Sequence, residues 1–148
     1  MSKKLVSQNR KAYHEFHIFD KYIAGMVLTG TEIKSIRKGA VNLKDSFVKI
    51  DAAEAFLHKC HISPYEQGNR YNVNPERVRK LLLNKKEIEK IIGKIKKEGY
   101  TIVPTELFIQ DGWAKLEIAL AKGKKLHDKR DDLAKKAQTR DIQRAMKR

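Results

Sequence analysis

The chain has few of the residues that cross-link a protein or anchor it in a membrane. Its 148 residues include one cysteine, Cys60, three prolines and an aromatic fraction of 7%. One cysteine cannot form an internal disulfide and argues against a cysteine-based zinc site, which suits a reducing compartment. No apolar run approaches the roughly 20 residues of a spanning helix, and the N-terminus lacks the apolar stretch of a signal peptide. We therefore expect a soluble, cytoplasmic protein.

Acidic residues are scarce relative to basic ones. Lys and Arg number 33 against 18 Asp and Glu, which gives a formal net charge of +15. This excess costs self-repulsion unless an anionic partner relieves it, and nucleic acid is the first candidate. Residues 122–148 carry eleven basic and four acidic side chains, a net charge of +7, and no aromatic residue. Such a segment cannot bury enough apolar surface to order itself. We expect one domain over residues 1–121 and a flexible basic tail over residues 122–148.

The periodicity of apolar residues predicts that the body consists mainly of strands. We expect frayed residues 1–11, two strands within 16–28 around Asp20-Lys21, a hairpin of strands 46–50 and 55–62, a loop over 63–74, and a second hairpin of strands 101–109 and 113–120. The last hairpin turns at Asp111-Gly112, two residues that tolerate positive φ. About six antiparallel strands in so small a chain favour a closed or partly open barrel.

Three helices are expected around these strands. Thr29 and Glu32 have the spacing of a capping box, and Gly39 can end the helix, which predicts a helix over 30–38. Asn74-Pro75 predicts the start of a second helix, with an apolar stripe of Val78, Leu81 and Leu82. The third begins at the Asn84–Glu87 cap in a new direction and ends at Gly99, with Ile88, Ile91, Ile92 and Ile95 on one face.

The sequence contains no recognisable catalytic motif. A Gly-rich phosphate loop, a Gly-x-Ser-x-Gly elbow and a His-Glu-x-x-His pair are all missing. His58, Cys60 and His61 come closest to a metal cluster, but in a strand His61 faces away from the other two, and packing or surface roles explain them better. We expect neither catalysis nor a cofactor.

RNA recognition needs cations for phosphates and flat side chains on which unpaired bases can stack. The available rings are Tyr13, His14, Tyr65, Tyr71 and Trp113. An aromatic residue in a small barrel is more often part of the core, so none of them alone identifies a site.

Five blocks of the sequence together resemble one family. They are Asn9–Ala12, Ala24–Ser35, Asn42–Phe47, Arg79–Asn84 and Ala121–Arg130. In this order and spacing the chain resembles the SmpB family of SsrA-binding proteins nearly end to end.

The resemblance implies a fold and a function. The family's body is an antiparallel barrel of the oligonucleotide-binding (OB) type with peripheral helices, here about six strands and three helices. It binds the tRNA-like domain of tmRNA (SsrA RNA) and delivers it to stalled ribosomes for trans-translation, while the tail probes the decoding centre and the empty mRNA channel. The resemblance also implies an indirect association with elongation factor Tu through aminoacylated tmRNA, and a monomer in the free form.

The resemblance further implies RNA-contacting positions on the body. They are Asn9, Lys11, Glu32, Lys34, Arg37, Leu82, Asn84 and Lys115. Glu32 and Asn84 are explained equally well as helix caps, and Leu82 as part of the predicted apolar stripe. Lys34 and Lys115 are stronger candidates, because an exposed cation that faces phosphate needs no packing to justify it. Ile23 stands where many members of the family have an acidic residue, so it lacks the carboxylate for such a contact.

In the tail, the resemblance implies contacts with the ribosome. The residues are Lys122, Lys124, Lys125, His127, Asp128, Lys129 and Arg130. The cations would neutralise phosphates, and His127 would stack on a base of the decoding centre. Asp131–Lys135 and Leu133–Ala137 are spaced by four, which allows a helix that is marginally stable alone.

Two other interpretations remain open on the residues alone. One is a structural ribosomal protein with a barrel body and a basic extension. The other is an RNA-processing enzyme that uses His14, His17 or the His58 cluster.

Overall fold

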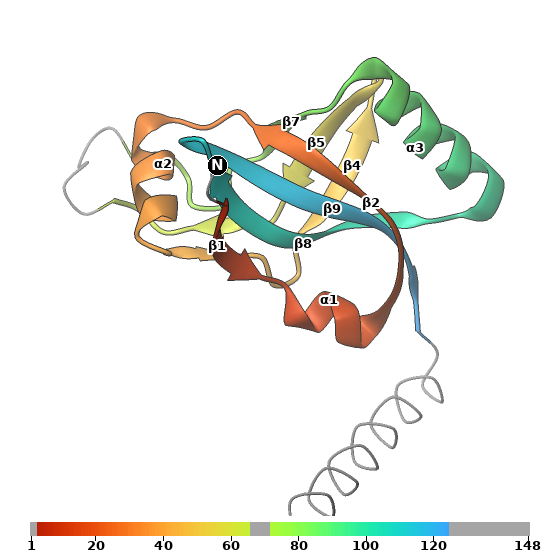
Figure 1. Cartoon of the computed structure of the whole chain (residues 1–148), viewed down its shortest axis with the longest axis horizontal. Coiled ribbons are helices and arrows are strands. Elements are labelled where there is room, and N and C mark those ends of the chain that lie inside the picture. Colours follow the sequence, from red (N-terminus) through yellow and green to blue (C-terminus); the bar gives the residue numbers. More distant parts are fainter. Residues whose placement is uncertain (1–2, 66–71, 125–148) are drawn as a thin grey trace, which may run out of the picture.

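A ring of antiparallel strands forms the centre of the protein, and helices lie around it (Figure 1). The computed structural model describes residues 3–65 and 72–124. The strands are β1 (Lys3–Gln8), β2 (Phe16–Met26), β3 (Val41–Asn42), β4 (Phe47–Asp51), β5 (Glu54–His58), β6 (His61–Ile62), β7 (Arg79–Leu82), β8 (Thr101–Gln110) and β9 (Trp113–Gly123). The helices are α1 (Arg10–Glu15), α2 (Gly30–Arg37) and α3 (Lys85–Glu98).

The main sheet closes on itself through its last two strands. Its order is β1-β8-β4-β5-β7-β2-β9, and β9 also pairs with β8, so six strands complete the ring. β8 pairs with β4 at Ile102 and with β1 along residues 106–110, which places β1 beyond β4 on the same edge. β3 and β6 form a separate two-stranded sheet. The predicted antiparallel barrel of about six strands with three peripheral helices is therefore confirmed, although α1 is a helix that the sequence did not predict.

Alternate side chains of β9 point into the ring of strands and fill its interior. Leu116, Ile118 and Leu120 are buried in the core, whereas Lys115 and Glu117, which alternate with them, are partly exposed, as the sequence predicts. The β8–β9 turn also agrees with the prediction, since Asp111 and Gly112 have φ values of 53° and 81°.

A second, smaller apolar cluster holds α1 against the outside of the barrel. Ala12 of α1 is buried with Val103 of β8 and Ala121 of β9, and Phe16 and Ile18 of β2 pack against them. These contacts join α1, the first helix, to β9, the last strand.

The N-terminal prediction was wrong. Within the residues predicted to be frayed, Lys3–Gln8 form β1 because their partners lie about a hundred residues away in β8. The side chain of Asn9 then caps α1 by accepting a hydrogen bond from the Ala12 N–H.

Two further strand predictions need correction. The two strands expected within 16–28 are one strand, β2, with an irregular register between Ile18 and Lys21 at the Asp20-Lys21 position. The strand expected over 55–62 is divided into β5 and β6, because Lys59 takes a positive φ of 59° and turns the chain.

The helix predicted after Asn74-Pro75 is absent from the described residues. Asn74 instead makes a turn, in which its side chain accepts from the Glu76 N–H and its carbonyl accepts from the Arg77 N–H. The following residues form β7, which pairs with β5 and β2. Local signals for a helix start were outweighed by strand pairing on both edges.

The other two helices follow the prediction. α2 has the Thr29–Glu32 capping box with Gly39 in the left-handed region, and α3 has the Asn84–Glu87 capping box with Gly99 at its C-cap. Ile91 is fully buried, and Ile95 packs against the same core.

Replacement of two adjacent leucines tests the strand assignment of β7. Leu81 is 2% exposed and Leu82 is 54% exposed, as strand alternation requires. We expect Leu81→Ala to lower the free energy of unfolding by about 2–5 kcal/mol and Leu82→Ala to change it by less than about 0.5 kcal/mol. Urea denaturation would measure both values. Equal losses would contradict the assignment, because a helix stripe would bury both side chains.

Candidate nucleic-acid interface

Three neighbouring strands align two predicted RNA-contacting residues and a glycine on the outer face of the barrel. Gly25 of β2 pairs with Leu82 of β7 on one side and with Lys115 of β9 on the other. Directly paired residues point to the same face of a sheet, and Leu116, next to Lys115, points into the core. A Cβ atom added to Gly25 would lie 3.4 Å from the Leu82 Cβ, so the Leu82 side chain lies over the bare glycine. We call Leu82, Gly25 and Lys115 the cross-strand row.

Apolar side chains are exposed on the same strands and beside them. Ile23 and Val27, on either side of Gly25, are each 44% exposed, and Trp113, two residues before Lys115, is 73% exposed. Large apolar side chains that gather on a surface indicate a contact surface more than single ones do. This part of the barrel therefore offers a flat apolar area beside a cation.

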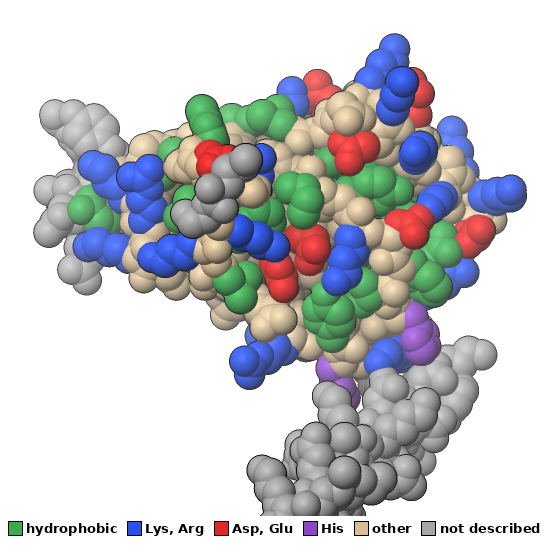
Figure 2. Space-filling view, viewed as in Figure 1, with side chains coloured by type: hydrophobic (Ala, Val, Ile, Leu, Met, Phe, Trp, Pro, Cys, Tyr) green, Lys and Arg blue, Asp and Glu red, His purple; other side chains and the backbone are tan. Residues whose placement is uncertain are grey.

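Cations gather over α2, next to the strands that carry this area (Figure 2). Lys34, Arg37 and Lys38 are all exposed. The Lys34 and Lys38 ammonium groups lie 5.4 and 4.8 Å from the centre of the Tyr65 ring. Both distances are within the range of cation–π attraction. Tyr65, one of the predicted stacking candidates, thus lies among basic side chains.

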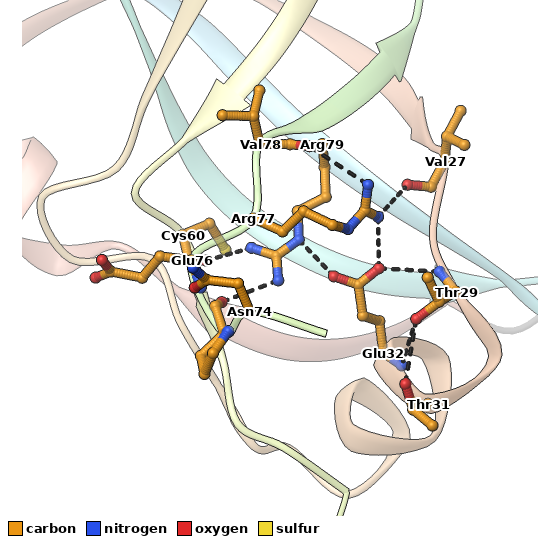
Figure 3. A network of polar contacts seen from close by, with 11 residues as sticks. Val27, Thr29, Thr31, Glu32, Cys60, Asn74, Glu76, Arg77, Val78 and Arg79 are labelled. Atoms are coloured by element: carbon orange, nitrogen blue, oxygen red, sulfur yellow. Dashed lines mark hydrogen bonds and ion pairs between the residues drawn. The ribbon is translucent and has the colours of Figure 1, made fainter. Parts of the chain in front are cut away.

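A buried ion-pair network fixes the position of α2 (Figure 3). The carboxylate of Glu32 accepts from Arg77 Nη2 at 2.6 Å and from Arg79 Nε at 2.7 Å. Arg79 is 0% exposed and also donates to the carbonyls of Cys60 and Pro75. The Thr29 N–H donates to Glu32 at 2.9 Å, which closes the capping box. Glu32 and Arg79 together therefore join α2, β7 and the segments at Cys60 and Pro75.

The network keeps Glu32 ionised although it is buried. Burial acts to raise the pKa of the Glu32 carboxyl, but hydrogen bonds from Arg77, the Thr29 backbone and Arg79 outweigh it and hold the pKa below its usual range. Burial raises the pKa of the adjacent Cys60 thiol to about 11. The thiol is therefore protonated at neutral pH and is a packing group rather than a nucleophile.

The predicted RNA-contacting residues fall into two groups. Lys34, Arg37, Leu82 and Lys115 present at least part of their side chains to solvent. The others have structural partners. Asn9 is buried and donates to the carbonyls of Pro104 and Leu43, Lys11 pairs with Asp45 at 2.6 Å, Glu32 joins the network, and Asn84 caps α3. Direct RNA contact by any of the eight stays a prediction.

Sequence reasoning assigned no role to Arg77 or Arg79. Both belong to a segment predicted to be helical, and their partner Glu32 lies more than forty residues away. Because the pairing is nonlocal, the only available signal was the Arg-x-Arg spacing, which suits two residues on one face of a strand.

Only the first tail residues lie within the described part of the chain. The Lys122 ammonium lies 4.8 Å from the centre of the Tyr100 ring, and the Lys124 N–H donates to the Glu15 carbonyl at 2.8 Å. Lys125, His127, Asp128, Lys129 and Arg130 lie outside the described residues, as do the helix-compatible spacings beyond them.

The His58 region has the geometry of packing. His58 stacks on Phe47 with ring centres 5.2 Å apart, and Cys60 is buried. Within residues 3–65 and 72–124, no three His, Cys, Asp or Glu side chains lie close enough together to hold a metal ion. No helix in this part of the chain is long and apolar enough to cross a membrane.

Comparisons with known proteins agree on one family. A family model described as SmpB protein matches residues 6–148. The SsrA-binding proteins of Geobacillus kaustophilus (strain HTA426) and Bacillus pumilus (strain SAFR-032) are 57% and 59% identical over 144 residues. These alignments cover 97% of this chain and 93% and 92% of the relatives. A chain of the solved structure "tmRNA-SmpB: a journey to the center of the bacterial ribosome" matches with a TM-score of 0.68 and 42% identity, over 81% of this chain and 85% of that chain.

The Glu32 network predicts a pH-dependent loss of stability. Because Glu32→Gln leaves the buried Arg79 guanidinium without its anion, we expect it to lower the free energy of unfolding at pH 7 by about 3–5 kcal/mol. The Glu32 carboxyl has a lowered pKa in the folded state, so its contribution is complete above the unfolded pKa of about 4.3 and is lost as the pH falls further. Urea denaturation at pH 7 and pH 3 should show the difference between wild type and variant shrinking.

The matched control is Glu54→Gln, which removes a carboxylate from an exposed pair with Lys80. We expect this variant to change stability by less than about 1 kcal/mol at either pH. A Glu32→Gln defect that stays constant between pH 7 and pH 3 would contradict the assigned role of the carboxylate.

Proposed function

The chain belongs to the SmpB protein family, and on this premise we propose that it binds the tRNA-like domain of SsrA RNA (tmRNA) and acts with it on stalled ribosomes in trans-translation. It works as a binding factor and makes or breaks no bond. The observation that carries the proposal is the cross-strand row, where Leu82, Gly25 and Lys115 lie side by side next to the cations of α2. Leu82 and Gly25 come from two of the sequence blocks that carry the resemblance, and Lys115 is one of the positions that the resemblance implies for RNA contact.

The chemistry of this face fits structured RNA. Lys34, Arg37 and Lys115 supply positive charge for phosphates, which gives affinity without reading sequence. Leu82 over Gly25 supplies a flat apolar contact for a ribose or an exposed base edge, and the absence of a side chain at position 25 keeps this surface low. Recognition by shape and backbone suits a partner that folds like a tRNA.

Glu32, Asn84 and Asn9 hold helices of the protein in place. Glu32 fixes α2, Asn84 begins α3 directly after β7, and Asn9 holds α1 to β8. Substitutions at these positions would weaken RNA binding by moving the exposed residues, whether or not their own atoms touch RNA.

The rest of the proposal concerns the tail and the cellular setting. Residues 122–148 would contact the decoding centre and the empty mRNA channel, with Lys122, Lys124, Lys125, Lys129 and Arg130 on phosphates and His127 on a base. The protein would meet elongation factor Tu only through aminoacylated tmRNA. It would be a cytoplasmic monomer when free.

Two substitutions in the cross-strand row separate the charge contribution from the apolar one. Lys115→Gln should weaken binding of SsrA RNA and reduce the slope of log affinity against log salt by about one, because one phosphate contact is lost. Leu82→Ala should weaken binding and leave the slope unchanged. Filter binding or fluorescence anisotropy over a salt series measures both quantities.

The control for charge is Lys49→Gln, which removes an exposed lysine from β4, a strand outside the row. We expect nearly wild-type binding from it. If Lys115→Gln and Lys49→Gln behaved alike, only general charge would be involved, and the assigned face would be wrong.

Removal of the tail should separate the binding of SsrA RNA from the tagging activity on stalled ribosomes. A chain that ends after Lys124 keeps β9 and the Lys124–Glu15 hydrogen bond. We expect its affinity for SsrA RNA to stay within about threefold of the full chain at equal salt, since most residual loss would come from general charge. Its ability to support peptide tagging in translation of a message without a stop codon should be lost. Tagging at the full-chain level would contradict the role of the tail.

A further inference from the structure

α3 presents a line of basic residues directly away from the barrel. Lys86, Lys90, Gly93 and Lys97 are spaced by four, three and four residues, so they share one face of the helix. All four are exposed, and they lie opposite the face of Ile91 and Ile95, which packs on the core. Figure 2 shows basic side chains gathered over α3 at the far end from α2. We call these four residues the α3 stripe.

The stripe is unfavourable for the isolated protein. Lys86 and Lys90 are like charges four residues apart, which weakens a helix. Another lysine of the helix, Lys94, pairs with Asp20 of β2. Among the ion pairs of the described residues, none involves Lys86, Lys90 or Lys97.

Gly93 supports a contact at the α3 stripe independently of the charges. Glycine inside a helix is less stable than alanine, and its presence usually has a packing or functional reason. Here packing gives no reason, because a Cβ atom on Gly93 would meet no described atom within 4 Å other than its chain neighbours and the backbone of its own helix. The helix backbone is therefore bare at the centre of a line of cations, which suits the close approach of another backbone.

We propose that the α3 stripe binds the phosphodiester backbone of the same SsrA RNA that the cross-strand row contacts, which rests on the function proposed above. The row and the stripe are close along the chain, since Leu82 ends β7 and the Asn84 cap of α3 follows two residues later. The 14 residues of α3 extend the surface by about 21 Å. One RNA strand would cross α3 at Gly93, with Lys90 and Lys97 on either side of it.

Two double variants that have the same net charge as each other test the stripe. Lys90→Gln with Lys97→Gln removes two charges from the stripe. Lys85→Gln with Lys96→Gln removes two exposed charges from the flank of the same helix. We expect the stripe variant to lose about tenfold or more in affinity for SsrA RNA and to reduce the salt slope by about 1.4 to 1.8. The flank variant should change neither quantity measurably.

Substitution of Gly93 gives a second readout that a purely structural role would not produce. Gly93→Ala should raise the melting temperature by about 2–4 °C because alanine favours the helix. Gly93→Gln, with the larger side chain, should weaken RNA binding severalfold while the fold is retained. A Gly93→Gln protein that is folded and binds RNA at the wild-type level would overturn the inference.

Binding of the same variants to purified ribosomes tests whether the α3 stripe contacts SsrA RNA or the ribosome. If the stripe variant lost affinity for ribosomes and kept its affinity for SsrA RNA, the assignment to SsrA RNA would be overturned. If the stripe and flank variants lost equal affinity for SsrA RNA, the effect would come from general charge, and the inference would be wrong. A wild-type protein that fails to bind SsrA RNA would overturn the proposed function itself. If the wild-type protein binds SsrA RNA and the stripe variant binds it equally well, only this inference would be overturned.

Discussion

The contact between the Glu32 carboxylate and the buried Arg79 guanidinium is the constraint on which the candidate interface depends. A fully buried guanidinium is tolerated only if its donors are satisfied, and here the acceptors come from α2, Cys60 and Pro75. This requirement restricts how these segments can be arranged around Arg79. Desolvation offsets much of the attraction within the pair, but removal of one partner alone is costly because it leaves the other charge buried and unpaired. It holds α2, which carries exposed cations, against β7, which pairs with β2, and so it positions the elements of the candidate interface.

Local signals predicted the parts of the fold that local chemistry decides. The capping boxes at Thr29 and Asn84 and the Asp111-Gly112 turn were found because each needs only neighbouring residues. β1 and β7 were missed for the opposite reason. β1 exists through its pairing with β8, and the short apolar run of β7 fits a strand or a buried helix equally well until its partners on both edges are known.

The candidate site shows the same limit at the level of single residues. The resemblance gave the positions but could not separate residues that face solvent from those that support them. Leu82 was explained as core because a helix stripe would bury it, whereas strand alternation turns it outward beside the buried Leu81. Asn9 and Glu32 were offered as RNA contacts, and their buried hydrogen bonds became visible only with the tertiary structure. The role of Arg79 could not be predicted, because burying an arginine requires acceptors that no local pattern reveals.

The order of the strands has a consequence for the time at which the interface can exist. β2 is synthesised early but completes its sheet with β9, from Phe16 opposite Gly123 to Gly25 opposite Lys115. Chains dominated by such nonlocal pairing fold slowly, since the ends of a long loop must meet before the contact is gained. Until residue 123 has been added, β2 has an open edge that can pair with other chains. The ability to hold RNA therefore reports that synthesis of the barrel has been completed.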